Sequence, residues 1–148
     1  NVFGRRQDPG GAYAAVIPKW IAALVRGEQV FINGDGETSR DFCYIENVVQ
    51  ANVLAATFET ISPHSQIYNI AVGEKTSLNE LYHFLEKAMP KQKKKNLGGP
   101  IYRGFREGDI LHSLADISTA KTLLGYAPSY KISQGLNEAM TWYLKDAS

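Results

Sequence analysis

The chain has 148 residues, a formal net charge of +1 and 44% hydrophobic residues, as expected of one soluble globular domain. The near-neutral charge lacks the basic excess typical of nucleic-acid-binding proteins, and the single cysteine excludes an internal disulfide framework. The sequence contains no signal-peptide pattern and no apolar run of about 18 residues, so we expect a cytoplasmic protein without a membrane segment. The sequence starts without methionine in what resembles the tail of a strand, which favours a cut piece of a longer chain.

The first third of the chain predicts one helix and a pair of strands. Apolar residues at helical spacing over 16–24 predict an amphipathic helix that begins close to Pro18 and ends at Gly27. Residues 29–33 then predict a short strand, and residues 39–45 its continuation beyond a two-glycine turn. Such a turn favours a hairpin.

The middle of the chain predicts two helices with a strand between them. Residues 47–58 are apolar on two helical faces, which is typical of a helix buried between layers. The short apolar run 67–72 predicts a strand of a covered sheet. Ser77 and Glu80 have the spacing of a capping box, at the start of a helix that Pro90 stops.

The last third continues this alternation. Residues 101–105 predict a further strand. Asp116 can cap a short helix that Gly125 closes, and Ser133 can cap a final helix through Leu144. Strands and helices therefore alternate, which predicts an α/β chain, but the strands are too few for a full doubly wound sheet.

Several chemistries are excluded by spacing. The three histidines share no metal-ligand spacing and there is one cysteine, so no metal site is expected. Cys43 lies between aromatic residues, as a small buried hydrophobic residue does. Gly34 and Gly36 resemble the opening of a dinucleotide fingerprint, but position 39 is Ser39 and no helix opens there. No tyrosine has a lysine four residues later. We therefore expect no catalytic and no cofactor-binding residue in this chain.

One arginine follows the two-glycine turn. Gly34 and Gly36 can adopt the positive φ angles that a tight turn requires, and the turn directs Arg40, which comes next in a strand pattern. Its planar fork of donors suits a phosphate or a carboxylate. The alternative is a solvated arginine on a surface hairpin.

Longer motifs resemble a known family. The chain resembles the C-terminal part of the extended short-chain dehydrogenases/reductases, specifically bacterial UDP-N-acetylglucosamine 4-epimerases, over nearly its whole length. The patterns Asn-x-Phe-Gly-x-Arg and Gly-Asp-Gly-x-x-x-Arg-Asp fix the superfamily, and residues 5–20 are the narrower signal. The motifs lie at residues 1–9, 12–20, 34–52, 68–73, 78–80, 105–109 and 112–113.

This resemblance implies a fold and a division of labour. Residues 1–148 would form the substrate-binding C-terminal portion, a partial Rossmann sheet plus a small substrate-binding subdomain. The N-terminal NAD-binding Rossmann part, which in the family carries the Tyr-x-x-x-Lys pair, would be absent. In the family, NAD takes a hydride from C4 of UDP-GlcNAc or UDP-GalNAc and returns it to the other face. The resemblance therefore implies NAD in the parent enzyme, none for this chain, and no turnover from these residues alone.

The resemblance also implies a set of substrate-binding residues. Arg40 would bind the pyrophosphate, Arg106 the phosphate and ribose side, and Asp109 the ribose hydroxyls. The remaining members would line the uracil (Phe31 and Asn33), the floor under the diphosphate and nucleoside (Asn1, Ala15, Val16 and Trp20) and the sugar (Gln7 and Ser113).

Some of these assignments have alternatives. Asp109 has the alternative of capping or pairing with Arg106, and Trp20 that of packing in the core. Phe31 departs from the tyrosine expected there and keeps only the stacking face. The small Ser113 leaves room for an N-acetyl group, which favours UDP-GlcNAc and UDP-GalNAc as substrates.

Two other functions stay open at this point. One is a nucleotide-sugar decarboxylase or dehydratase with the same C-terminal motifs. The other is a non-catalytic dimeric binding module. Without most of the sheet, the apolar faces of residues 48–58 and 67–72 would be exposed, and such patches are usually covered by a partner. We therefore expect a homodimer.

Overall fold

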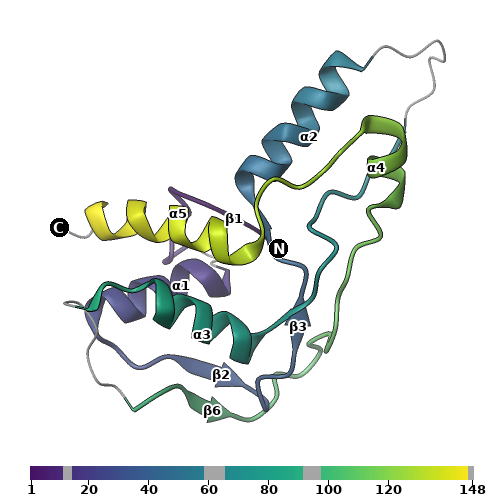
Figure 1. Ribbon diagram of the computed structural model, residues 1–148. Coiled ribbons are helices and arrows are strands. Elements are labelled where there is room, and N and C mark those ends of the chain that lie inside the picture. Colours follow the sequence, from purple (N-terminus) through teal and green to yellow (C-terminus); the bar gives the residue numbers. More distant parts are fainter. Residues whose placement is uncertain (12–14, 59–65, 92–97, 147–148) are drawn as a thin grey trace.

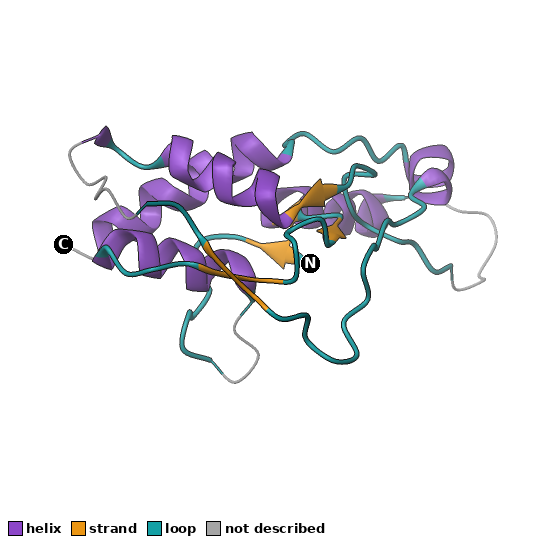
Figure 2. Cartoon of the chain, turned by 90° about the horizontal axis from the view of Figure 1, so that it is seen from below, coloured by secondary structure: helices purple, strands orange, loops and turns teal. Residues whose placement is uncertain are grey.

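The computed structural model describes residues 1–11, 15–58, 66–91 and 98–146 (Figure 1). Its larger core joins three helices, α1 (Val16–Arg26), α3 (Leu78–Ala88) and α5 (Ile132–Asp146), with the short strand β2 (Phe31–Asn33). Strand β6 (Ile101–Arg103) is exposed and lies beside β2. The two strands pair in parallel. Figure 2 shows them lying across one face of the helical layer.

A second, smaller core lies beside the first. Helix α2 (Ile45–Thr57) packs against α4 (Ser118–Leu124) around the buried side chains of Ala51 and Ala120.

Strand β1 (Val2–Phe3) pairs in parallel with β4 (Cys43–Tyr44) at the point where α2 begins (Figure 1). The described strands thus form short two-stranded sheets, which confirms an α/β chain with only part of a doubly wound sheet.

Helix α1 confirms the predicted amphipathic helix with an earlier start. It begins at Val16, two residues before Pro18, which therefore lies in the first turn, where its missing N–H is not needed. The predicted apolar stripe is buried, from Ile17 to Leu24. Gly27 ends the helix with a φ of 70°, a left-handed conformation that glycine adopts without a steric penalty.

The predicted hairpin between residues 29–33 and 39–45 is wrong. Strand β2 pairs with β6, whereas β3 (Ser39–Arg40) pairs antiparallel with β5 (Thr76–Ser77). The two-glycine turn is fixed by the start of α3. The backbone N–H of Asn79 donates to the Gly36 carbonyl, and its side chain donates to the Asp35 carbonyl. These long-range bonds direct the chain towards β5, and they outweigh the local preference for a hairpin.

The predicted strand at residues 67–72 is also wrong. The segment is extended, but no strand pairs with it among the described residues. It is held by side chains instead. The buried carboxylate of Asp41 accepts from the N–H groups of Val72 and Gly73, both at 3.0 Å, and the Tyr126 hydroxyl donates to a carbonyl of the segment at 2.8 Å.

The helix starts confirm some predicted caps and shift others. The capping box of Ser77 and Glu80 is present, with both reciprocal hydrogen bonds, and Asp116 accepts from the N–H of the first residue of α4. Helix α5 begins at Ile132, one residue before the expected cap. Helix α2 begins at Ile45, before the start expected at Asn47. The amide of Asn47 is buried and bonds both backbone groups of Tyr130.

Helix α2 is less buried than its sequence predicts. Only one of its faces packs on the second core, and Val49 and Val53 are 46% and 56% exposed. The expectation of a helix buried between two layers is therefore wrong for the described residues, whereas the exposure expected in the absence of most of the sheet is observed. No helix among them is long and apolar enough to cross a membrane.

The prediction that Cys43 is a small buried residue is confirmed. The thiol lies in β4 and is 1% exposed, and burial raises the pKa of the thiol. A thiol that resists ionisation is a poor nucleophile.

Candidate substrate-binding site

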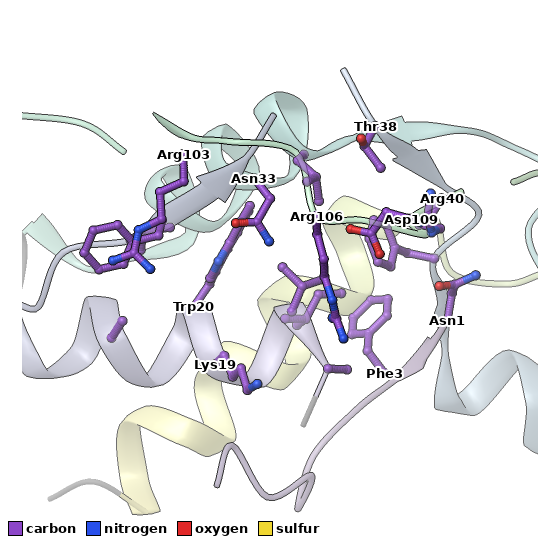
Figure 3. A pocket seen from close by; sticks show the side chains of 18 of the residues that line it. Asn1, Phe3, Lys19, Trp20, Asn33, Thr38, Arg40, Arg103, Arg106 and Asp109 are labelled. Carbon is purple, nitrogen blue, oxygen red and sulfur yellow. The ribbon is translucent and has the colours of Figure 1, made fainter. Parts of the chain in front are cut away.

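A cavity of about 600 Å³ lies between α1, the strands β1 and β2, and the chain that follows β6. Its volume is in the range of small-molecule binding sites. Figure 3 shows its side chains converging from elements that are far apart in the sequence. Nine of the eleven predicted site residues line it: Asn1, Ala15, Val16, Trp20, Phe31, Asn33, Arg40, Arg106 and Asp109.

The cavity also contains two charged residues that sequence reasoning missed, Lys19 and Arg103. Lys19 directly precedes Trp20 on α1, and this position next to a predicted site residue could have identified it as a candidate. Arg103 had no local signal, because it reaches the cavity only through the pairing of β6 with β2.

Arg40 is fixed at one end of the cavity by its backbone surroundings. Its Nη1 donates to the carbonyls of Ser39 and Leu111, at 2.9 and 3.3 Å. Ser39 in turn bonds the chain at residues 111–113 through its N–H and its carbonyl. The arginine is therefore half-buried, with its side chain held against the chain at Leu111, and the solvated hairpin arginine of the alternative does not occur.

Arg106 and Asp109 share an exposed turn on the other wall of the cavity. The backbone N–H of Asp109 donates to the Arg106 carbonyl at 3.3 Å. Among the ion pairs of the described residues their side chains form none with each other. Figure 3 shows the Arg106 side chain extended down the middle of the cavity. The alternative role of Asp109, an ion pair with Arg106, is thus not seen among the described residues.

Trp20 lies where both of its predicted roles are possible, in the core and at the wall of the cavity. It is 7% exposed and meets the ring of Tyr82 edge to face, with centroids 6.4 Å apart. It also contributes to the wall of the cavity. Its core packing therefore fixes the orientation of the indole that faces the cavity.

Phe31 stays partly open at the other end. Its ring is 38% exposed, and the guanidinium carbon of Arg103 lies 3.4 Å from the ring centroid. This is a cation–π contact, which stabilises a flat guanidinium on an aromatic face.

The charges around the cavity favour an anionic ligand. Among the described residues, four cationic side chains line it, against the single carboxylate of Asp109: Lys19, Arg40, Arg103 and Arg106. Cationic groups that converge on a concave surface concentrate anions there.

Ser113 and Gln7, the two predicted sugar contacts, lie outside this cavity. Ser113 lines a second cavity of about 250 Å³ together with Asp41 and Asp116. Asn1 lines both cavities, so they adjoin each other. Gln7 is not among the residues that line either one; its backbone carbonyl accepts from the hydroxyl of Tyr143 at 2.7 Å.

The described residues contain no group of three or more His, Cys, Asp or Glu that could hold a metal ion. The turn at Gly34 and Gly36 leads into β3 instead of a helix. A dinucleotide phosphate binds where such a turn opens a helix, so this turn does not fit NAD.

Comparison with known proteins places this site in a family. Residues 1–71 match the model of the NAD-dependent epimerase/dehydratase family. A putative UDP-glucose 4-epimerase of Methanocaldococcus jannaschii is 33% identical over 96% of this chain and 43% of its own length. The UDP-glucose 4-epimerase of Thermotoga maritima, solved with UDP-glucose, has a TM-score of 0.86 at 34% identity over 100% of this chain and 45% of its own.

The UDP-N-acetylglucosamine 4-epimerase of Methanobrevibacter ruminantium, solved with UDP-N-acetylmuramic acid, has a TM-score of 0.84 at 37% identity over 99% of this chain and 44% of its own. A UDP-glucuronic acid 4-epimerase of Bacillus cereus, solved with UDP-glucuronic acid and NAD, is 28% identical, with a TM-score of 0.78. A UDP-N-acetyl-alpha-D-glucosaminuronate decarboxylase of Bacillus cytotoxicus is also 28% identical.

The chain therefore belongs to the NAD-dependent epimerase/dehydratase family, and its fold is that of the extended short-chain dehydrogenases/reductases in it. It spans less than half the length of the relatives that it matches.

Proposed function

We propose that this chain is the UDP-sugar-binding portion of an NAD-dependent UDP-N-acetylglucosamine 4-epimerase. The observation that carries the proposal is the composition of the first cavity. Arg40 and Arg106 line it together with the carboxylate of Asp109, which can accept from ribose hydroxyls, and with the aromatic ring of Phe31. This is the sequence of groups that a nucleoside diphosphate needs, because two cations balance the diphosphate and an aromatic face stacks on a base.

The second cavity supports a sugar position. It adjoins the first cavity at Asn1 and is lined by the small side chain of Ser113. We propose that the hexose extends past Asn1 towards Ser113, where a small residue leaves room for an N-acetyl group. This favours UDP-GlcNAc and UDP-GalNAc over plain hexoses. Gln7 stays a proposed sugar contact on the resemblance alone.

The proposal assigns binding, and no chemical step, to this chain. Its sequence has no Tyr-x-x-x-Lys pair, and the two-glycine turn does not fit NAD. NAD would act in the complete family enzyme, and we assign no role in the reaction with NAD to these residues. The interactions made here would hold the non-reacting end of the substrate, whose binding energy positions the reacting carbon.

The test combines calorimetric titration of the 148-residue chain with an epimerase assay. We expect UDP and UDP-GlcNAc to bind with micromolar affinity, because the cavity supplies charge and stacking together. With NAD added, we expect no conversion of UDP-GlcNAc to UDP-GalNAc. A chain that binds neither ligand would refute the substrate-binding proposal, and measurable turnover would refute the division of labour.

The same site suits a second candidate, a nucleotide-sugar decarboxylase, which the Bacillus cytotoxicus relative favours. Both enzymes would use the UDP contacts in the same way, and they differ in the sugar. We expect UDP-GlcNAc to bind at least as tightly as UDP-N-acetylglucosaminuronic acid if the chain serves an epimerase. A clear preference for the uronic acid in competition titrations would favour the decarboxylase.

We also propose that the chain self-associates as a homodimer. Val49 and Val53 on α2, Phe58 just after it, and Ile67 are exposed apolar side chains, and such a surface is usually covered. We expect light scattering after size exclusion to give twice the mass of the chain, and Val53→Lys to lower it towards the monomer. A wild-type monomer at high concentration would contradict this proposal.

A further inference from the structure

The contact between Arg103 and Phe31 has no role in holding a diphosphate. Figure 3 shows Arg103 at the opposite end of the cavity from Arg40 and Asp109, with Arg106 between them. Two arginines already face the proposed diphosphate. A third cation at the far end therefore needs another ligand group.

The strand pairing fixes where Arg103 points. Asn33 and Arg103 are partners in the register of β2 and β6, and Phe31 lies two residues before Asn33. Side chains alternate between the faces of a strand, so all three project from the same face, and all three line the cavity. The guanidinium lies 3.4 Å from the centroid of the Phe31 ring. At that distance it is stacked on the ring, which fixes the plane in which its N–H donors point.

We propose that Arg103 is a base-recognition residue, whose guanidinium is held in place by stacking on Phe31 and donates from its edge to a uracil base. This inference rests on the proposed function, because it adds a residue to the same nucleotide site. A guanidinium has only donors, and uracil offers two ring carbonyl oxygens as acceptors. The amide oxygen of Asn33 can accept from the N–H between them.

The same chemistry selects against cytosine. Cytosine carries an amino group in place of one carbonyl of uracil, and that amino group would face the donors of Arg103. The donors of Arg103 therefore prefer a uracil nucleotide to a cytosine nucleotide, because cytosine would place a donor against a donor.

The experiment measures UDP and CDP affinity by calorimetry for the full 148-residue chain and its variants. We expect Arg103→Ala to weaken UDP binding about tenfold, the range of a cation–π and hydrogen-bonded base contact, and to reduce the preference for UDP over CDP. Arg103→Lys keeps the charge but loses the planar fork, so we expect it to be nearly as weak. Lys121→Ala, an exposed cation on α4 outside the cavity, is the matched control and should bind as wild type.

Phe31→Leu provides a second route to the same result. It removes the ring under the guanidinium while Arg103 stays, and we expect a similar loss of UDP affinity that the double variant does not deepen. Melting temperatures within a few degrees of wild type would show that the fold is kept.

Several results would overturn the inference. UDP affinity restored by Arg103→Lys would show that only charge matters, and unchanged affinity in Arg103→Ala would show that no base contact exists. Both leave the proposed function intact, provided that wild type still binds UDP and Arg40→Ala still binds it far more weakly. A wild-type chain that binds no UDP would overturn the proposed function as well.

Discussion

Replacing Arg40 with alanine is expected to weaken UDP binding by roughly 100-fold, about 2.8 kcal/mol. The guanidinium is half-buried at the end of the cavity and is held there by the Ser39 and Leu111 carbonyls. A pre-positioned arginine loses little conformational freedom when it binds a phosphate, and charge-assisted hydrogen bonds are about twice as strong as neutral ones. Titration of UDP into the variant measures the loss.

Two controls separate the phosphate contact from the rest of the structure. Arg40→Lys keeps the charge without the bidentate fork, so we expect an intermediate loss of about tenfold. Arg26→Ala removes an exposed arginine that pairs with Glu28 at the other end of α1, and its UDP affinity should equal that of wild type. If Arg40→Ala bound UDP within threefold of wild type while folding normally, Arg40 would not be a phosphate ligand.

Replacing Asp41 with alanine is expected to lower the free energy of unfolding by about 3 kcal/mol. The carboxylate is 4% exposed and accepts from the N–H groups of Val72 and Gly73. Hydrogen bonds to a charged group contribute about 1.5–3 kcal/mol each, and an unpaired buried donor costs about 1–3 kcal/mol. Because no strand pairs with residues 67–72 among those described, these bonds are the main fixed points of the segment. Urea unfolding followed by tryptophan fluorescence measures the effect.

Asp116→Ala is the matched control for this variant. Its carboxylate also accepts from a backbone N–H, that of Ser118, but it is exposed, so its loss should destabilise the chain much less than the loss of Asp41 does. Hydrogen bonds from the Ser118 side chain and from its backbone N–H lower the pKa of Asp116, so this smaller contribution is lost as the pH falls through the acidic range. Equal destabilisation by the two variants would mean that the burial of Asp41 adds nothing.

The local features that the sequence predicted are those whose causes are local. The capping box at Ser77 and the glycine stop at Gly27 follow from hydrogen bonds and φ angles within a few residues. The buried stripe of α1 follows from helical spacing. Helix boundaries differ from the predicted ones where a residue bonds a distant partner, as Asn47 does with Tyr130.

The candidate site shows the same division. Composition and motifs named nine of the residues that line the cavity, because the motif residues keep fixed places along the chain. Arg103 was not predicted, because only the parallel pairing of β2 and β6 brings it next to Phe31. The strand expected at residues 67–72 failed for the converse reason, because an apolar run becomes a strand only beside another strand to pair with.

By itself, then, the sequence determined the α/β pattern, the capping box of α3, the family resemblance and two of the four cations that line the cavity, Arg40 and Arg106. The tertiary structure decided which strands pair, that Lys19 and Arg103 also line the cavity, and that the Arg40 side chain bonds the Leu111 carbonyl while Arg103 stacks on Phe31. Local hydrogen bonds and side-chain periodicity act over a few residues, whereas strand pairing and cavity formation join residues about 70 positions apart, such as Asn33 and Arg103.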